Sequence, residues 1–476
     1  MPPDTIERTP LTLRDPSLLR QQCYVDGRWI NADDGGSMPV VDPATGVPVG
    51  TAPVFHAAET KHAIDAASRA WPAWRAKTAK ERSTILRKWF DLMMANQEDL
   101  AQILTAEQGK PLAESRGEIA YGASFIEWFA EEGKRAYGDT IPSPWADKRV
   151  LVLKQPIGVC ALITPWNFPN AMITRKAGPA LAAGCTVVIK PAGQTPYSAL
   201  AMAELGERAG IPKGVLNILT GDSKAIGAEL CSSPKVRKLS FTGSTETGRI
   251  LMKQCADTIK KLSLELGGNA PFIVFDDADL DAAVEGALAS KYRNAGQTCV
   301  CANRLYVQDG VYDAFAAKLT EKVKGFKVGA GTEPGVVIGP LIDENGVKKV
   351  EAHVADAVGK GAKIVLGGKR HSLGGLFFQP TVLTGVTPDM LVSHEETFGP
   401  VAPLIRFKTE EDAIRLANDT EFGLSGYFYS RDVGRIFRVA EQMETGIVGA
   451  NVGIISTEIA PFGGVKQSGL GREGSK

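Results

Sequence analysis

The sequence has no excess of charge of either sign. Its 54 Lys and Arg residues equal its 54 Asp and Glu residues, so the formal net charge at pH 7 is zero. Nucleic acids and anionic membranes select basic surfaces, and the balance therefore argues against either as the main partner. With 476 residues, of which 44% are hydrophobic and 23% charged, the chain has a globular composition and enough length for about three domains.

The sequence also lacks C-x-x-C cysteine pairs, a recognisable secretory signal and a candidate membrane span. None of the seven cysteines forms a C-x-x-C pair, so neither a disulfide framework nor a metal site is expected. The N-terminal segment lacks a basic region followed by an apolar core, which makes a reducing cytoplasm the expected compartment. The longest charge-free run lies between Lys154 and Arg175, and its three prolines favour strand, turn and helix over a membrane span.

Apolar strands and helical segments alternate from Val150 onward. Helices of about 10–15 residues between strands predict βαβ crossovers and a parallel sheet covered by helices on both faces. The alternation is less regular after Gly267, where we expect a second α/β domain. Residues 137–154 interrupt the helices and are predicted to project as a pair of strands.

Cys299 is a candidate nucleophile in the loop GQTC, directly after a predicted helix. Rigid scaffolds present reactive groups on such loops, although a lone cysteine is most often a buried structural residue. A hydrolytic cysteine mechanism needs a histidine base, and none of the five histidines lies in a comparable loop.

Glu265 and Asn167 are polar residues in or beside predicted strands. Glu265 lies in the apolar strand LSLEL before two glycines, where burial would raise the pKa of its carboxyl and make it a base. A salt-bridged or sheet-end glutamate is the alternative. Asn167 follows the first strand of the α/β run and could donate to a developing oxyanion, or it could simply form a turn.

The residues give only an indirect cofactor signal. No G-x-G-x-x-G motif is present, and the nearest segment is GSTETG at residues 243–248, between a strand and a helix. Its backbone N–H groups could bind a pyrophosphate, or Ser244 could be an ordinary helix cap. Lys190, at the end of strand TVVIK, could reach a ribose or a phosphate.

Seven motifs occur together in a family-specific order. They are TPWNFP, VVIKPAGQTP, FTGSTETG, ELGG, GQTC, EETFGP and PFGG. In order and spacing they resemble the aldehyde dehydrogenase superfamily from about Tyr24 to the end of the chain. Local stretches such as RNAGQTCVCANRLYVQDGVYD resemble its succinate-semialdehyde dehydrogenase branch.

The resemblance implies an α/β, aldehyde dehydrogenase-like fold in three parts. Residues 1–133 and 151–267 would form a discontinuous, Rossmann-type cofactor domain with a parallel sheet, and residues 268–463 an α/β catalytic domain. Residues 134–150 and 464–476 would form a small β oligomerisation arm, which predicts a homodimer or homotetramer. Members of the family continue with a further assembly strand where this sequence reaches GREGSK.

The resemblance also implies the chemistry. Cys299 would attack an aldehyde, Asn167 would hold the oxyanion, and Glu265 would activate the water that hydrolyses the thioester. NADP is the expected cofactor, with NAD possible, because Gly193 replaces a glutamate that many NAD-using relatives carry and that would repel a 2′-phosphate. The residues implied to bind the cofactor are Thr164, Pro165, Trp166, Lys190, Gly193, Gln194, Gly221, Gly243, Ser244, Glu396 and Phe398.

The implied substrate is a small aldehyde with a carboxylate at its far end. Arg175, Arg293 and Ser456 match the positions that bind this carboxylate in the succinate-semialdehyde branch, although either arginine could instead be an internal ion-pair partner. Succinate semialdehyde would be oxidised to succinate, with glutarate semialdehyde or broader aliphatic aldehydes as the alternative. Acyl transfer or hydrolysis through Cys299 without redox is a second enzyme class. Cys301 is either a redox partner of Cys299 or a small apolar filler.

Overall fold

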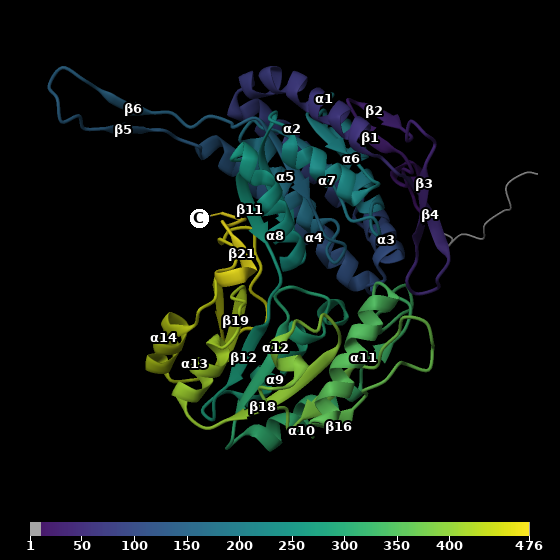
Figure 1. The fold of residues 1–476 in the computed structure, drawn as a ribbon, viewed down its shortest axis with the longest axis vertical. Helices are drawn as coiled ribbons and strands as arrows, with labels where there is room; N and C mark the ends of the chain where they lie inside the picture. Colours follow the sequence, from purple (N-terminus) through teal and green to yellow (C-terminus); the bar gives the residue numbers. More distant parts are fainter. Residues whose placement is uncertain (1–10, 476) are drawn as a thin grey trace, which may run out of the picture.

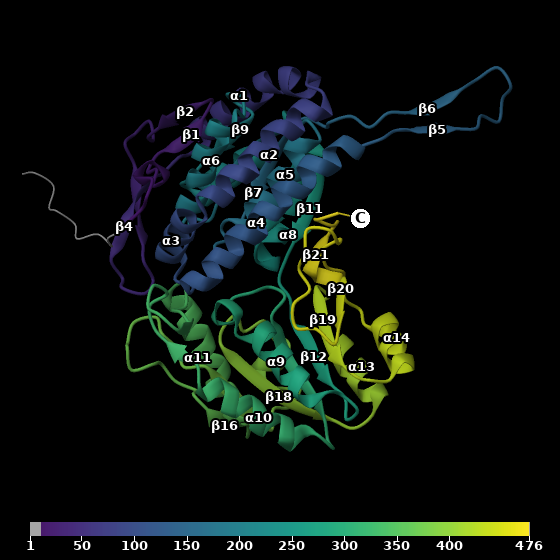
Figure 2. The same ribbon diagram turned by 180° about the vertical axis from the view of Figure 1, so that it is seen from behind.

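The computed structural model describes residues 11–475 and contains two large sheets (Figures 1 and 2). Residues 1–10 and 476, which the predicted domain ranges include, lie outside the described residues. A long hairpin projects from the N-terminal half. Among the described residues, no helix combines the length and apolar character that crossing a membrane requires.

The first sheet has eight strands in the order β2-β1-β9-β8-β7-β10-β11-β21. Its central strands, from β9 to β11, are parallel, as the alternating sequence predicts. The strands are β1 (Cys23–Val25), β2 (Arg28–Ile30), β7 (Val159–Ile163), β8 (Thr186–Lys190), β9 (Leu216–Ile218), β10 (Val236–Thr242), β11 (Lys261–Glu265) and β21 (Gly469–Leu470).

Helices cover both faces of this sheet, which is why β8 is buried along its whole length. Helices α5 and α6 pack on one face with α2, while α1 and α7 pack on the other with α8. A small β3–β4 hairpin lies beside them. The bounds are β3 (Ser37–Val41), β4 (Pro48–Pro53), α1 (Ala57–Ala76), α2 (Ala79–Ala95), α3 (Gln97–Gln108), α4 (Leu112–Glu132), α5 (Ala171–Ala182), α6 (Tyr197–Ala209), α7 (Ser223–Ser232) and α8 (Thr245–Cys255).

The second sheet has seven strands in the order β16-β17-β18-β13-β12-β19-β20. All its pairings are parallel except β16–β17. This confirms the expected second α/β body. The strands are β12 (Ala270–Val274), β13 (Ala302–Gln308), β16 (Lys363–Leu366), β17 (Thr381–Thr384), β18 (Val401–Phe407), β19 (Ser425–Tyr429) and β20 (Ile447–Ala450).

Helices also surround the second sheet; α9 and α10 pack on each other and on β13. A separate small pair is formed by β14 and β15. The bounds are α9 (Leu280–Lys291), α10 (Tyr312–Lys324), β14 (Lys327–Val328), β15 (Val336–Ile338), α11 (Glu344–Gly359), α12 (Leu391–His394), α13 (Glu410–Asn418) and α14 (Val433–Gln442). Short 3-10 helices occur at η1 (Pro16–Leu18), η2 (Gly133–Arg135), η3 (Ala256–Thr258), η4 (Arg293–Gly296) and η5 (Lys466–Ser468).

The projecting hairpin consists of β5 (Asp139–Ile141) and β6 (Val150–Val152), as predicted (Figures 1 and 2). The C-terminal segment differs from its prediction, because 464–475 does not join this arm. Instead β21 pairs antiparallel with β11, with Gly469 opposite Glu265. A Cβ at position 469 would come within 2.0 Å of the Leu264 carbonyl oxygen, so glycine lets this segment close onto the first sheet.

Candidate active site

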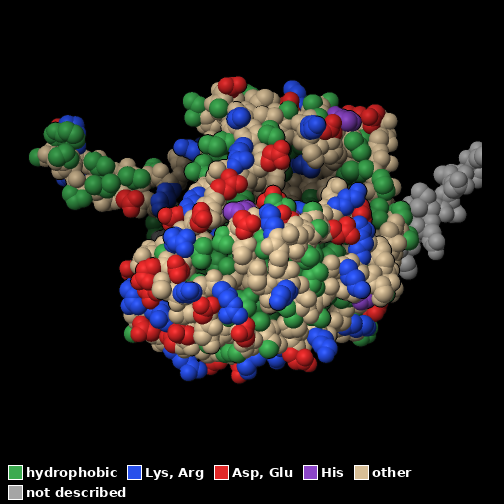
Figure 3. All heavy atoms as spheres, turned by 60° about the horizontal axis from the view of Figure 1, so that its bottom comes forward, with side chains coloured by type: hydrophobic (Ala, Val, Ile, Leu, Met, Phe, Trp, Pro, Cys, Tyr) green, Lys and Arg blue, Asp and Glu red, His purple; other side chains and the backbone are tan. Residues whose placement is uncertain are grey.

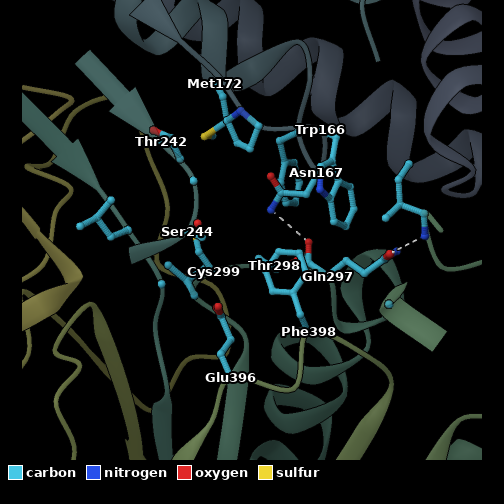
Figure 4. A pocket seen from close by; sticks show the side chains of 18 of the residues that line it. Trp166, Asn167, Met172, Thr242, Ser244, Gln297, Thr298, Cys299, Glu396 and Phe398 are labelled. Carbon is cyan, nitrogen blue, oxygen red and sulfur yellow. Dashed lines mark hydrogen bonds between the residues drawn. The ribbon is translucent and has the colours of Figure 1, made fainter. Parts of the chain in front are cut away.

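A cavity of about 740 Å³ is lined by residues from both halves of the chain. Trp166, Asn167 and Ser244 follow strands of the first sheet, whereas Cys299 and Glu396 precede strands of the second (Figure 4). Trp166 and Asn167 follow β7 and Ser244 follows β10, at the carboxyl ends of parallel strands, where open α/β sheets bind ligands.

A left-handed turn precedes Cys299 and sets its position. Asn294 and Ala295 have φ values of 52° and 54°, a conformation that non-glycine residues adopt at a cost. Buried contacts offset this cost, because the Asn294 side-chain amide donates to the carbonyl oxygens of Asn167 (3.0 Å) and Gln297 (3.2 Å). The same asparagine therefore ties the cysteine loop to the segment that carries Asn167.

Asn167 is held from two sides. Its side-chain Nδ2 donates one hydrogen bond to the carbonyl of Gln297 (3.1 Å), which leaves its other N–H for a ligand (Figure 4). Its backbone carbonyl accepts a hydrogen bond from Lys110 Nζ (2.7 Å), whose charge is paired with Glu118 (2.6 Å) in a fully buried ion pair. An amide fixed in this way is a preorganised donor for an oxyanion.

The thiol of Cys299 is partly exposed to the cavity. The surrounding protein atoms raise its pKa to about 12, and the charges of Glu396 and Glu265 act in the same direction. The Arg175 guanidinium opposes them. Since the thiolate is the nucleophile, this thiol needs a base to take its proton.

Glu265 ends β11 and is buried, 2% exposed. Neither of its carboxylate oxygens has a hydrogen-bond partner among the described residues. Burial raises the pKa of this carboxyl to about 9, and the nearby Glu473 adds to the shift. It does not line the cavity itself, although the next two residues, Leu266 and Gly267, do. A buried carboxyl with uncommitted oxygens is suited to hold a water molecule and accept its proton.

Glu473 and Lys176 form a buried ion pair behind Glu265 that the sequence analysis missed. Glu473 also accepts a hydrogen bond from Ser240 (3.0 Å), and its second oxygen lies 4.0 Å from Arg175 Nε. Burial raises the pKa of Glu473, but the charges of Lys176 and Arg175 outweigh burial and hold this pKa below its ordinary value. Glu473 therefore stays charged, which explains why it disfavours a second charge on Glu265.

The residues expected around the cofactor fall into two groups. Ser244 caps α8 and lies with Gly243 in the cavity wall, so the N-terminal backbone N–H groups of α8 are placed to meet an anion. The other group lies at the end of β8 and in the segments after β8 and β9, outside the cavity wall. It comprises Lys190, Gly193, Gln194 and Gly221, and Thr164 joins it by donating its backbone N–H to the Lys190 carbonyl (3.1 Å).

Lys190 is a buried cation with one protein hydrogen bond, from Nζ to the Pro191 carbonyl (3.1 Å). Burial lowers the pKa of its ammonium to about 8, and Asp222 opposes the shift. A cation that has no carboxylate within ion-pair distance among residues 11–475 fits a ribose or phosphate group of a dinucleotide. These residues together fit a nicotinamide dinucleotide that extends from β8 to the cavity.

Glu396 and Phe398 reach the cavity from the segment after α12. The backbone N–H of Gly268 donates to Glu396 Oε1 (3.3 Å), while burial raises the pKa of this carboxyl to about 7. Phe398 has a left-handed φ of 55°, and its ring contacts that of Trp166 edge to face at 5.5 Å. Pro165 lies beside Trp166 in the same cavity wall.

Arg175, Arg293 and Ser456 all line the cavity, as expected for the substrate end. The Arg175 guanidinium is 2% exposed, lies 4.0 Å from the centre of the Phe462 ring and donates to the hydroxyl of Tyr121. Tyr121 was not predicted, because its helix α4 lies far away in the sequence and carries no motif.

Cys301 is buried and does not line the cavity. Its thiol donates to the carbonyl of Lys291 (3.3 Å), and all seven cysteines of the chain are free. The described residues contain no cluster of three or more His, Cys, Asp or Glu side chains able to hold a metal ion.

A model of the aldehyde dehydrogenase family matches residues 29–476. The chain belongs to this family. The succinate-semialdehyde dehydrogenase [NADP(+)] of Escherichia coli is 68% identical over 98% of this chain and 97% of its own length. A glutarate-semialdehyde dehydrogenase of Pseudomonas aeruginosa is also 68% identical, over 98% of this chain and 96% of its own. The crystal structure of succinate-semialdehyde dehydrogenase from Burkholderia pseudomallei, 68% identical, covers 98% of this chain and 96% of that chain with a TM-score of 0.97. The aldehyde dehydrogenase fold predicted from the motifs is therefore confirmed.

Proposed function

We propose that this aldehyde dehydrogenase oxidises succinate semialdehyde to succinate, with NADP as the preferred cofactor. The observation that carries the proposal is one cavity that holds Cys299 together with two guanidinium groups, Arg175 and Arg293. An aldehyde at the thiol with a carboxylate at its far end would meet these charges, because arginine pairs with carboxylates through parallel hydrogen bonds. The name of the Escherichia coli relative supports both substrate and cofactor.

The first chemical step is addition of the Cys299 sulfur to the aldehyde carbon. A C–S bond forms, and the carbonyl oxygen takes the negative charge of the thiolate. The free N–H of the Asn167 amide and the backbone N–H of Cys299 would donate to this oxygen. Glu265, whose charge acts on Cys299, is the candidate base for the thiol proton.

The second step is oxidation followed by hydrolysis. NADP, when bound, would supply the acceptor for the hydride that leaves the substrate carbon. The Cys299 adduct then becomes a thioester, and Glu265 takes a proton from the attacking water. The C–S bond breaks, the carboxylic acid leaves, and the electron pair returns to the Cys299 sulfur.

The preference for NADP rests on position 193. Gly193 has no carboxylate to repel a 2′-phosphate, and Lys190 is a nearby cation that can pair with one. We also propose that Thr164, Gln194 and Gly221 line the adenosine side and that Gly243, Ser244, Glu396 and Phe398 lie along the pyrophosphate and nicotinamide side.

Glutarate semialdehyde is the second candidate substrate, and the Pseudomonas aeruginosa relative supports it. One added methylene changes discrimination by only about 1–3 kcal/mol, so the same arginines can serve both substrates. The test is aldehyde-dependent formation of reduced cofactor with succinate semialdehyde, glutarate semialdehyde and butanal, each with NADP and NAD. We expect the highest kcat/KM for succinate semialdehyde with NADP. Ester hydrolysis without any cofactor reduction would instead support acyl transfer through Cys299.

We propose that the β5–β6 hairpin is an assembly arm for a homodimer or homotetramer. It carries exposed apolar side chains, including Tyr137, Trp145, Leu151 and Leu153. Figure 3 shows hydrophobic side chains along the projection. An apolar surface of this kind on a two-stranded ribbon is typical of an interface. Light scattering should give a dimer or tetramer, and Leu151→Ser with Leu153→Ser should shift it toward monomer. A wild-type monomer would refute the proposal.

The domain ranges remain part of the proposal. The first sheet supports a cofactor domain of residues 1–133 and 151–267, and the second sheet supports a catalytic domain of residues 268–463. Residues 134–150 belong to the arm. A cytoplasmic location is likewise proposed.

A further inference from the structure

The segment that carries Glu396 has an unusual backbone. Glu395, Glu396 and Thr397 connect α12 to β18, and the next residue, Phe398, adopts a left-handed φ of 55°. Backbone of this kind persists only where surrounding contacts determine it. Two buried side chains from other elements supply such contacts. Each of them forms hydrogen bonds with both Glu395 and Thr397, the neighbours of Glu396.

Asn303 of β13 holds the backbone of this segment. Its Nδ2 donates to the Glu395 carbonyl (2.9 Å), and its Oδ1 accepts from the Thr397 N–H (3.2 Å). The same Nδ2 donates to Asn269 Oδ1 (2.6 Å). Asn303 is 2% exposed, so water does not compete for these bonds. The side-chain amide thus bonds one peptide group before Glu396 and one after it.

His353 of α11 holds the side chains of the same segment. Its Nε2 lies 3.3 Å from Glu395 Oε2, and its Nδ1 lies 3.2 Å from Thr397 Oγ1. A carboxylate only accepts hydrogen bonds, so Nε2 carries the proton and Nδ1 accepts from the Thr397 hydroxyl. Burial and the charge of Lys349 lower the pKa of His353, which favours this neutral form although Glu395 and Asp356 oppose the shift. His353 is 1% exposed, and it is the buried histidine among the five.

We propose that Asn303 and His353 are positioning residues that clamp the 395–397 segment and thereby aim Glu396 at the cofactor. The inference rests on the proposed role of Glu396 in holding the nicotinamide half of NADP. With both contacts in place, the backbone of the segment is fixed, and the Glu396 carboxylate can move only by rotation about its own side-chain bonds. In the observed position it accepts a hydrogen bond from the Gly268 N–H. Loss of either contact lets the segment relax from its strained backbone and removes Glu396 from this position.

The first experiment measures cofactor binding without any aldehyde. Quenching of tryptophan fluorescence reports NADP binding, since Trp166 lines the cavity. His353→Leu should raise the dissociation constant about tenfold, the effect of losing two hydrogen bonds of ordinary net strength. His353→Gln keeps one donor and one acceptor and should recover most of the affinity. The matched control is His371→Leu, since His371 lies in the loop after β16 and does not line the cavity.

Steady-state kinetics separate positioning from general damage. In His353→Leu the KM for NADP should rise about tenfold, while the KM for the aldehyde should stay within about twofold, because Arg175 and Arg293 are untouched. An equal rise in both KM values, or a wild-type dissociation constant in the folded variant, would overturn the proposal. The binding assay needs no turnover, so it remains decisive even if the wild-type enzyme fails to oxidise succinate semialdehyde.

A gentler variant covers the case in which His353→Leu does not fold. Thr397→Val keeps the shape of the side chain but removes its hydroxyl, which donates a hydrogen bond to the imidazole of His353. It should weaken NADP binding about threefold. In the His353→Gln background the same change should have about the same effect, because the glutamine amide keeps an acceptor for this hydroxyl. An unchanged dissociation constant in Thr397→Val would contradict the clamp.

Discussion

The side-chain amide of Asn167 donates to the carbonyl of Gln297, two residues before Cys299 (3.1 Å). The candidate oxyanion donor and the candidate nucleophile therefore belong to one hydrogen-bonded unit, although they come from different halves of the chain. Asn167→Ala removes both the free N–H and this link. We expect kcat to fall about 10²–10³-fold, the usual effect of losing an oxyanion donor. A loss below tenfold in steady-state turnover would argue against the assignment.

Cys299, and not Cys301, is expected to be the nucleophile. Cys299→Ala should abolish aldehyde oxidation with an unchanged circular dichroism spectrum, whereas Cys301→Ala should keep most of it, because Cys301 does not line the cavity. Near-normal turnover by Cys299→Ala would refute the mechanism.

Comparison of the wild-type enzyme with Cys301→Ala tests the proposed redox role of Cys301. A thiolate-forming Cys299 oxidises first to a sulfenic acid, which a second thiol can trap as a disulfide. Mild peroxide should inactivate the enzyme and a thiol reductant should restore it, with restoration lost in Cys301→Ala. Equal recovery of both proteins would leave Cys301 as the apolar filler.

Glu265 should impose a rising pH dependence on the hydrolytic step. A carboxyl with a pKa of about 9 is mostly protonated at pH 7, so the fraction of active base should increase about tenfold per pH unit up to that value. Glu265→Gln should lower kcat about 10²–10⁴-fold and abolish the rise of the rate with pH. A flat wild-type profile in single-turnover thioester hydrolysis would contradict the assignment.

The same pKa shift has a stability consequence with a definite sign. The folded pKa lies above the unfolded one, so folding takes up a proton between about pH 4.5 and 9 and stability falls as pH rises through that window. Glu265→Gln should therefore raise Tm at pH 8 more than at pH 5, as calorimetry can measure.

Gly193→Glu should move the cofactor preference from NADP toward NAD. A Cβ at this position would meet only the Met38 side chain, at 3.5 Å, so the new carboxylate can be accommodated. Its repulsion of a 2′-phosphate should lower kcat/KM for NADP roughly 10–100-fold. Gly193→Ala is the matched control and should change the ratio little. A wild-type enzyme that already prefers NAD would refute the basis of the prediction.

Butanal should be a poor substrate compared with succinate semialdehyde of equal chain length. Without a carboxylate on the substrate, the guanidinium groups of Arg175 and Arg293 lose their substrate partner in the complex, and kcat/KM should fall by about 10²-fold or more. Arg293→Met should reduce this discrimination mainly through the KM for succinate semialdehyde. Equal efficiency with both aldehydes would indicate a broader aliphatic aldehyde dehydrogenase.

The motifs predicted the residues that touch the cavity better than those that support it. GQTC and TPWNFP are short motifs at the ends of helices or strands, and each contains its functional residue. Cys299 and Asn167 could therefore be predicted from the sequence. Lys110, Asn303, His353 and Glu473 act through contacts with residues far along the chain, and no local pattern marks such pairings. The C-terminal segment was misplaced for the same reason, because its partner strand β11 precedes it by about two hundred residues.

The pairing of β21 with β11 gives this enzyme a weak point. β21 has two residues and lies at the edge of the first sheet, yet it leads directly to Glu473, whose ion pair with Lys176 lies behind Glu265. Short edge strands open locally at lower free energy than core strands. In a urea titration, catalytic activity should therefore disappear before the far-ultraviolet circular dichroism signal changes. Amide hydrogens of the β21 segment should likewise exchange with deuterium faster than those of β7 and β8, so the enzyme would lose its function by local opening while most of its structure remains folded.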